Sequence, residues 1–194
     1  MRPAPAAACR PGRPGGAAAN DKNPGAGAGR EALGRSRGGL TTKIHLAADR
    51  RCRPLTSILT PGQHHDSPAF IPLLAQIRIA RRGTGHPRTR PGRVLADKAY
   101  SSAANRAYLR RRGIKGVIPV KDDQQAHRRA RGRRGGRPPA FDPARYRERN
   151  TVERCINKLK QFRAVATRYD KRELIYQGTL DVASIRIWLR DPVL

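Results

Sequence analysis

The sequence predicts an α/β fold in which a mixed sheet is flanked by helices. The first observation behind this prediction is the element order from about residue 38 onward: a hairpin, a helix, a strand, a helix, a strand and then helices. Such an order is typical of layered α/β domains. The second observation is the length, because 194 residues provide one domain of ordinary size.

A hairpin and a helix are the first predicted elements. Residues 41–48 predict a strand and residues 54–60 its hairpin partner, with a turn between them and Pro-Gly after the second strand. Asp66, Ser67 and Pro68 then open a helix, since Pro is favoured in the first helical turn. The apolar set of that helix is Phe70, Ile71, Leu73, Leu74 and Ile77.

Two further strands and a second helix follow. Residues 94–96 predict a short buried strand that Asp97 ends. Ser101 or Ser102 can cap the next helix, which we expect to run to Arg112 and to stop at Gly113. Residues 116–120 predict the last strand. Since Asp97 directly follows the strand predicted over residues 94–96, we expect it at the carboxyl end of a strand within the sheet.

The first 32 residues differ from the rest of the chain. Ala, Gly, Pro and Arg make up 24 of residues 1–30, and Val, Ile, Leu and aromatic residues are absent there. Such a segment cannot bury apolar area, so residues 1–32 are expected to be disordered and residues 33–194 to form the domain. The segment is either a flexible basic arm or GC-rich DNA translated out of frame, because GC-only codons encode these four residues; the sequence favours the second reading.

The composition restricts the function classes. A net charge of +28 favours a polyanionic partner, since Lys and Arg release counterions when they neutralise phosphates. A structural RNA-binding protein without chemistry would satisfy the charge as well. Three separated cysteines argue against disulfides and zinc, which fits a reducing cytoplasm, and the absence of an apolar run of about 18 residues argues against a membrane span.

A basic loop is expected over residues 121–140. Six arginines occur among the twelve residues 127–138. Without a ligand this loop is expected to be solvated and disordered. It could order by contacting phosphates on DNA.

The most informative segment is a helix predicted over residues 146–160. Five polar residues share an arc of about 80° on its helical wheel, and Val152, Cys155, Leu159, Phe162 and Ala166 form the opposite, buried face. The polar stripe consists of Tyr146, Arg149, Glu153, Asn157 and Lys160. A surface helix with a single ion pair between Arg149 and Glu153 would explain two of these five residues.

The spacing Tyr-x2-Arg-x3-Glu-x6-Lys resembles the signature of bacterial insertion-sequence transposases with a DDE (Asp-Asp-Glu) catalytic core. The resemblance extends from residue 33 to about residue 190. Besides the signature it rests on residues 34–45, 95–100, 166–171 and 187–189.

This resemblance implies a ribonuclease-H-like fold and DNA cleavage and strand transfer by two divalent metal ions, Mg²⁺ or Mn²⁺. Asp97 and Glu153 would be the second and third catalytic carboxylates and hold the metal. Tyr146, Arg149 and Lys160 would contact DNA. The expected partners are transposon ends and target DNA, bound by a homo-oligomer in the cytoplasm near the nucleoid.

The sequence departs from the family at the first catalytic aspartate. That residue belongs on a strand upstream of the hairpin, the central strand of the sheet, where only Asp21 occurs, without β-forming neighbours. Asp49 and Asp66 lie in a turn and at a helix start. We therefore expect a truncated or frame-shifted copy that lacks its central strand; the alternative is a catalytically inactive DNA-binding remnant.

Overall fold

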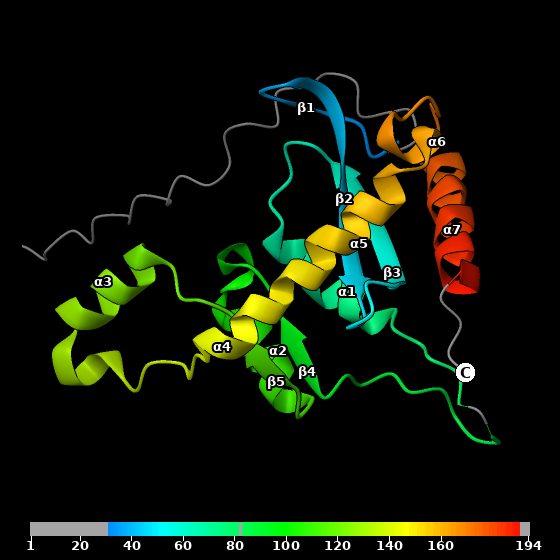
Figure 1. The fold of residues 1–194 in the computed structure, drawn as a ribbon. Coiled ribbons are helices and arrows are strands. Elements are labelled where there is room, and N and C mark those ends of the chain that lie inside the picture. The colour runs from blue at the N-terminus through cyan, green and yellow to red at the C-terminus, as the bar shows by residue number, and fades with distance from the viewer. Residues whose placement is uncertain (1–30, 82, 191–194) are drawn as a thin grey trace, which may run out of the picture. The chain divides into compact units, whose positions relative to one another are not determined.

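The computed structural model describes residues 31–81 and 83–190 (Figure 1). They belong to one compact unit, Glu31–Leu194. The disorder predicted for residues 1–32 concerns residues that lie almost wholly outside the described ones. Glu31 and Ala32 are described, and they join the unit: Ala32 is buried, and its carbonyl accepts a hydrogen bond of 2.7 Å from the Thr42 hydroxyl.

The described elements alternate as the sequence predicts, and the α/β class is confirmed. In chain order they are β1 (Gly34–Ser36), β2 (Gly39–Ala48), β3 (Pro54–Pro61), η1 (Ser67–Ala69), α1 (Phe70–Ala75), β4 (Arg93–Leu95), η2 (Lys98–Tyr100), α2 (Ala103–Arg111), β5 (Lys115–Val117), α3 (Asp122–Ala130), η3 (Gly132–Gly135), α4 (Pro143–Tyr146), η4 (Arg147–Arg149), α5 (Asn150–Lys160), α6 (Arg163–Ala166) and α7 (Glu173–Arg190), where η is a 3-10 helix.

The described strands form two separate sheets. One is antiparallel, with the order β1-β2-β3; in it Ile44 pairs with Leu59, and the register shifts after Ala47. The other contains β4 and β5 in parallel, with Val94 opposite Gly116. Among the described residues no strand pairing joins β2 to β4.

Most element predictions are confirmed within one or two residues, and the capping signals explain why. The Ser102 hydroxyl caps α2 by accepting the N–H of Asn105 at 3.1 Å, and Gly113 ends the helix region with a φ of +63°. The strand predicted over residues 116–120 is wrong in extent, because β5 ends at Val117. Pro119 has no N–H to donate to a ladder.

The basic segment is partly helical rather than a loop. α3 covers residues 122–130, and η3 follows it. Asp122 and Asp123 lie in the first turn of α3 and His127, Arg128 and Arg129 in its last turn, which is the charge order that a helix dipole favours. α3 has no buried residue, and Figure 1 shows it projecting away from the sheets.

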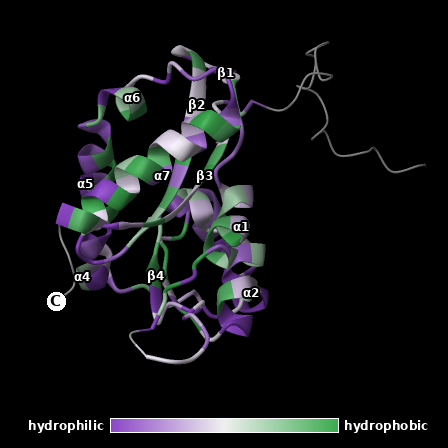
Figure 2. Cartoon of the chain, turned by 90° about the vertical axis from the view of Figure 1, so that its right-hand side faces the viewer, coloured by the Kyte–Doolittle hydropathy of each residue, from purple (hydrophilic) through white to green (hydrophobic). Residues whose placement is uncertain are grey.

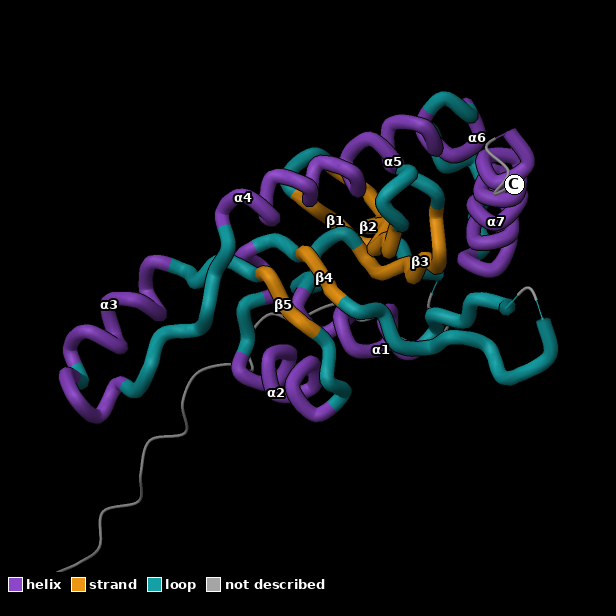
Figure 3. Tube along the Cα trace, turned by 60° about the horizontal axis from the view of Figure 1, so that its bottom comes forward, coloured by secondary structure: helices purple, strands orange, loops and turns teal. Residues whose placement is uncertain are grey.

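Two apolar clusters hold the unit together. In one, α7 and α5 pack on the β2–β3 hairpin through Leu59, Leu159 and Leu180. In the other, α1 and α2 pack beside β4 and β5 through Phe70, Leu109 and Ile118. β4 lies between the α4–α5 segment on one side and α1 with α2 on the other, which the hydropathy view and the tube view both show (Figures 2 and 3).

No described helix combines the length and the apolar composition needed to cross a bilayer.

Candidate functional site

Asp97 lies two residues beyond Leu95, the carboxyl end of β4, close to where the sequence places it. Its carboxylate accepts the N–H of Lys98 at 2.6 Å and so caps η2. Capping uses one carboxylate oxygen. The side chain is exposed, which leaves its other oxygen accessible.

Tyr146, the last residue of α4, lies near Asp97. Its hydroxyl and the Asp97 carboxylate interact electrostatically. Burial raises the pKa of Tyr146; nearby Arg149 lowers it, and Asp97 and Glu153 raise it again. The phenol is therefore held in its neutral, donating form beside two carboxylates.

Arg149 and Glu153 complete this group. Nη2 of Arg149 lies 2.7 Å from Oε1 of Glu153, one turn along the helix, and the guanidinium carbon lies 5.6 Å from the centroid of the Tyr146 ring. Tyr146, Arg149 and Glu153 come from the successive elements α4, η4 and α5, which form one continuous helical stretch. We call Asp97, Tyr146, Arg149 and Glu153 the four-residue cluster.

Lys160 does not join the four-residue cluster. It is exposed at the last position of α5, seven residues beyond Glu153, which corresponds to about 10 Å along the helix axis. The polar stripe predicted from the sequence is thus one face of a helix, and one end of it forms the cluster. Of the predicted buried face, Cys155 and Leu159 are buried, whereas Ala166 is exposed because α5 ends at Lys160.

A partly open cavity of about 710 Å³ adjoins the cluster. The sequence did not reveal it, because its walls come from four segments that are far apart in the chain. Asp97, Arg149 and Glu153 lie on its wall. The other lining residues come from four parts of the chain. β2 and the turn after it contribute Ile44, His45, Leu46, Ala47, Ala48, Asp49 and Arg50, and the segment from β3 to the end of α1 contributes Leu55, Asp66, Phe70, Leu73, Leu74 and Ile77. β4 and its flanks contribute Pro91, Arg93, Val94, Leu95, Ala96 and Tyr100, and η4 and α5 contribute Glu148, Thr151, Val152, Arg154 and Ile156.

A second polar group on the same wall was not predicted from the sequence. Nε2 of buried His45 lies 2.8 Å from the Thr60 hydroxyl, and Nδ1 lies 3.3 Å from the Tyr100 hydroxyl. Burial lowers the pKa of His45, and burial with Asp66 and Asp97 raises that of Tyr100 to about 12. Both side chains are therefore neutral near pH 7 and act as hydrogen-bonding groups.

The remaining carboxylates near the cavity are engaged by cations. Lys43 Nζ binds Asp66 at 2.9 Å, Arg53 Nε donates to Asp49 at 2.7 Å, and Arg145 Nη1 lies 3.5 Å from Oε1 of Glu148. Within residues 31–81 and 83–190 no group of three His, Cys, Asp or Glu side chains could hold a metal ion. Asp97 and Glu153 nevertheless offer exposed carboxylate oxygens beside one cavity, the donor type that Mg²⁺ prefers.

Comparison with known proteins identifies the family. A family model described as "Transposase DDE domain" matches residues 8–180. A Brucella ovis protein assigned as the transposase for insertion sequence element IS6501 is 30% identical over 151 residues, which are 78% of this chain and 100% of that protein. A Burkholderia cepacia protein assigned as the transposase for element IS402 is 34% identical over 139 residues, 72% of this chain and 58% of that protein.

No solved structure matches the chain. The family match covers most of the sequence and includes the end of β4 and the α4–α5 stretch that carry the four-residue cluster. The chain belongs to the DDE-domain transposases of bacterial insertion sequences.

Proposed function

We propose that this chain contributes to transposase-type DNA cleavage and strand transfer by two-metal phosphoryl transfer, with Asp97 and Glu153 as two of the metal-binding carboxylates. The observation that carries the proposal is their convergence with Arg149 on one cavity wall, beside which Tyr146 interacts with Asp97. A divalent cation (Mg²⁺, or Mn²⁺ in its place) bound there supplies Lewis-acid chemistry at the scissile phosphate.

The other two cluster residues have roles that follow from their chemistry. Arg149 carries a fixed positive charge and a planar donor group suited to a phosphate. In the structure that group pairs with Glu153, so a cation at Glu153 would free it to bind DNA. The neutral Tyr146 phenol lies beside the Asp97 carboxylate, where it can position the DNA strand.

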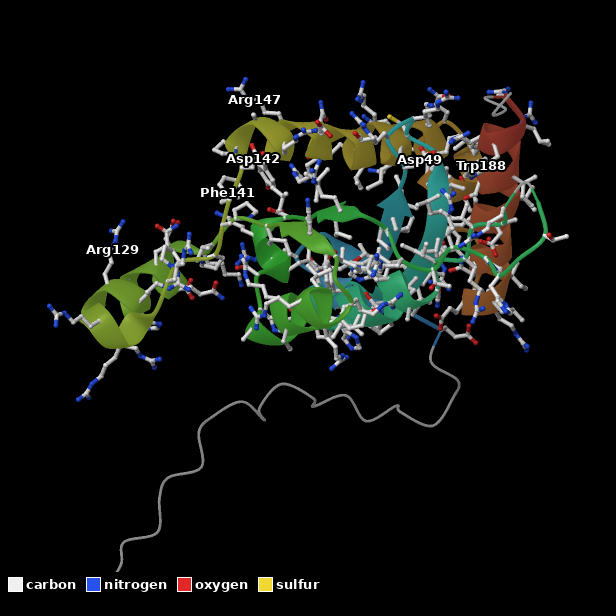
Figure 4. All side chains as sticks on the ribbon, turned by 90° about the horizontal axis from the view of Figure 1, so that it is seen from below. Asp49, Arg129, Phe141, Asp142, Arg147 and Trp188 are labelled. Carbon is white, nitrogen blue, oxygen red and sulfur yellow. The ribbon has the colours of Figure 1, made fainter. Side chains whose placement is uncertain are left out.

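DNA contacts extend beyond the cluster. Lys160 is exposed on the same helix, and the arginines of α3 and η3 project into solvent; Figure 4 shows Arg129 pointing away from the rest of the unit. Such side chains add phosphate contacts without base specificity. The proposed partners are transposon ends and target DNA, bound by a homo-oligomer in the cytoplasm near the nucleoid.

The proposed metal site lacks the first catalytic aspartate. A ribonuclease-H-like sheet would place a central strand with the first catalytic aspartate between the β2–β3 hairpin and β4. The cavity lies between those two parts, and the nearby Asp49 and Asp66 are paired with Arg53 and Lys43. We therefore treat the chain as a truncated copy that does not cleave DNA efficiently by itself.

The experiment combines a metal-binding and a cleavage measurement on the full chain. Mn²⁺ affinity, measured by electron paramagnetic resonance, should fall at least about tenfold in Glu153→Gln and in Asp97→Asn, because each removes a charged oxygen ligand. Asp181→Asn on α7 is the control. Unchanged affinity in both variants contradicts the metal assignment. Strong Mg²⁺-dependent nicking that Glu153→Gln abolishes would instead show that the chain holds all its ligands.

A catalytically inactive DNA-binding remnant is the second candidate. The observation that favours it is that the other three described carboxylates on the cavity wall, those of Asp49, Asp66 and Glu148, are each paired with Lys or Arg. It predicts strongly salt-dependent DNA binding that neither Mn²⁺ nor Glu153→Gln changes.

A further inference from the structure

The turn that carries Asp97 is short and depends on its surroundings. Asp97 caps η2, and the N–H of Tyr100 donates to the Asp97 carbonyl at 3.0 Å, so both residues belong to one turn. The N–H of Ser101 closes the next hydrogen bond, to the Lys98 carbonyl at 3.1 Å. A 3-10 helix of three residues has weak hydrogen-bond geometry. The direction of the Asp97 side chain therefore depends on contacts that hold this turn from outside.

Tyr100 makes contacts of this kind with three elements. Its ring packs against that of Phe70 in α1, with 5.5 Å between the ring centroids. Its carbonyl accepts a hydrogen bond of 3.1 Å from Nδ2 of Asn105 in α2. Its hydroxyl lies 3.3 Å from Nδ1 of His45 in β2, and this contact joins the turn to the β2–β3 hairpin.

His45 is itself fixed within the hairpin. It is only 4% exposed, and its Nε2 lies 2.8 Å from the hydroxyl of Thr60 on β3. A neutral imidazole has one donor and one acceptor nitrogen, so Thr60, His45 and Tyr100 form one hydrogen-bonded chain whose direction the tautomer sets. Burial of a polar ring is costly unless its nitrogens have partners. The Tyr100 hydroxyl is therefore a partner that His45 requires.

This side-chain contact occurs where the backbone provides no link. Among the described strands no pairing joins β2 to β4. His45 and Tyr100 both line the cavity between these strands, and their hydrogen bond connects the hairpin to the segment that follows β4. Fully hydrogen-bonded buried groups of this kind make the surrounding structure more rigid.

We propose that His45 is a positioning residue, which holds the turn of residues 97–100 through the Tyr100 hydroxyl and so fixes the direction of the Asp97 carboxylate on the cavity wall. The effect on metal binding rests on the proposed function, whereas the fixing of the turn rests on the contacts alone.

The first test measures hydrogen exchange by NMR on the full, metal-free chain. Tyr100→Phe and Thr60→Val are a matched pair, because each removes one hydroxyl that is hydrogen-bonded to His45. Relative to the Leu180 amide in the core, which corrects for global stability, the Ser101 amide should exchange at least about fivefold faster in Tyr100→Phe and change by less than about twofold in Thr60→Val. Equal acceleration in both variants, or none in Tyr100→Phe, overturns the proposal.

Two substitutions of His45 separate positioning from simple packing. His45→Phe should accelerate Ser101 exchange as Tyr100→Phe does. His45→Asn should keep exchange slow, because its amide places a hydrogen-bonding group where Nδ1 was. Fast exchange in His45→Asn as well would contradict a role through Tyr100. The Tyr100→Phe and Thr60→Val pair still decides the question if a His45 variant does not fold.

Mn²⁺ affinity, measured by electron paramagnetic resonance, separates this inference from the proposed function. It should fall at least about threefold in Tyr100→Phe and stay unchanged in Thr60→Val, because a loosely held carboxylate must be ordered when the ion binds. A loss in Asp97→Asn without a loss in Tyr100→Phe would refute the positioning of this ligand and leave the proposed function standing. No loss in Asp97→Asn would refute the proposed function, and the exchange rates alone would then decide whether His45 holds the turn.

Discussion

The guanidinium of Arg149 lies 2.7 Å from the Glu153 carboxylate and 5.6 Å from the centre of the Tyr146 ring, so one cation contacts both an acid and an aromatic ring of the candidate site. Because Arg149 is the cluster's only cation, its removal should alter DNA binding more than the loss of a similar charge elsewhere. Arg149→Gln should reduce the slope of log affinity against log salt by about 1, through loss of one phosphate contact. Arg186→Gln on α7 is the matched control, and an equal change in both variants would contradict a specific contact.

The α3 arm should bind phosphates without contributing to the core. Replacing Arg129, Arg133 and Arg134 by Gln should lower DNA affinity and reduce the salt slope by roughly 2–3, because each exposed arginine can neutralise about one phosphate. The melting temperature should stay unchanged, since α3 and η3 have no buried residue. The control replaces the exposed Arg78, Arg110 and Arg172, and the prediction is wrong if that triple variant loses as much affinity.

The free energy of unfolding should depend on Leu180, which packs between α7 and the β2–β3 hairpin, but not on Leu174, an exposed leucine of the same helix. Leu180 is 1% exposed and Leu174 is 83% exposed. Leu180→Ala should cost about 2–5 kcal/mol of unfolding free energy because it leaves a cavity. Leu174→Ala should change it by less than about 0.5 kcal/mol. Urea unfolding followed by circular dichroism measures both, and similar costs would contradict this packing of α7.

The free energy of unfolding should fall at alkaline pH, in part because of Tyr100. Its pKa is raised to about 12 in the folded protein, chiefly by burial, so folding favours the neutral phenol. That contribution is fully present below the unfolded pKa of about 10 and is lost as pH rises through about 12.

Tyr100→Phe removes that contribution, so its unfolding free energy should fall less between pH 10 and 12 than that of the parent chain. Burial also raises the pKa of the Cys155 thiol to about 12, with the same sign, but this group remains in both proteins. Urea unfolding at pH 8, 10 and 11.5 gives the comparison. Parallel declines in the two proteins would show that Tyr100 is not held neutral by the fold.

The sequence by itself determined the local elements and the class. The two runs of residues 41–48 and 54–60 around a turn predicted β2 and β3, and the helical spacing of Arg149 and Glu153 predicted their contact. Such features depend on neighbours within one turn or one hairpin, so the sequence pattern is enough to predict them.

Only the tertiary structure decided what lies together across the chain. It brings the Tyr146 hydroxyl to Asp97, leaves Lys160 apart, and opens a cavity between β2 and β4. These relationships depend on how the apolar faces of α1 and α5 pack around separate strands. Since many residues contribute small energies to that packing, no single motif encodes it.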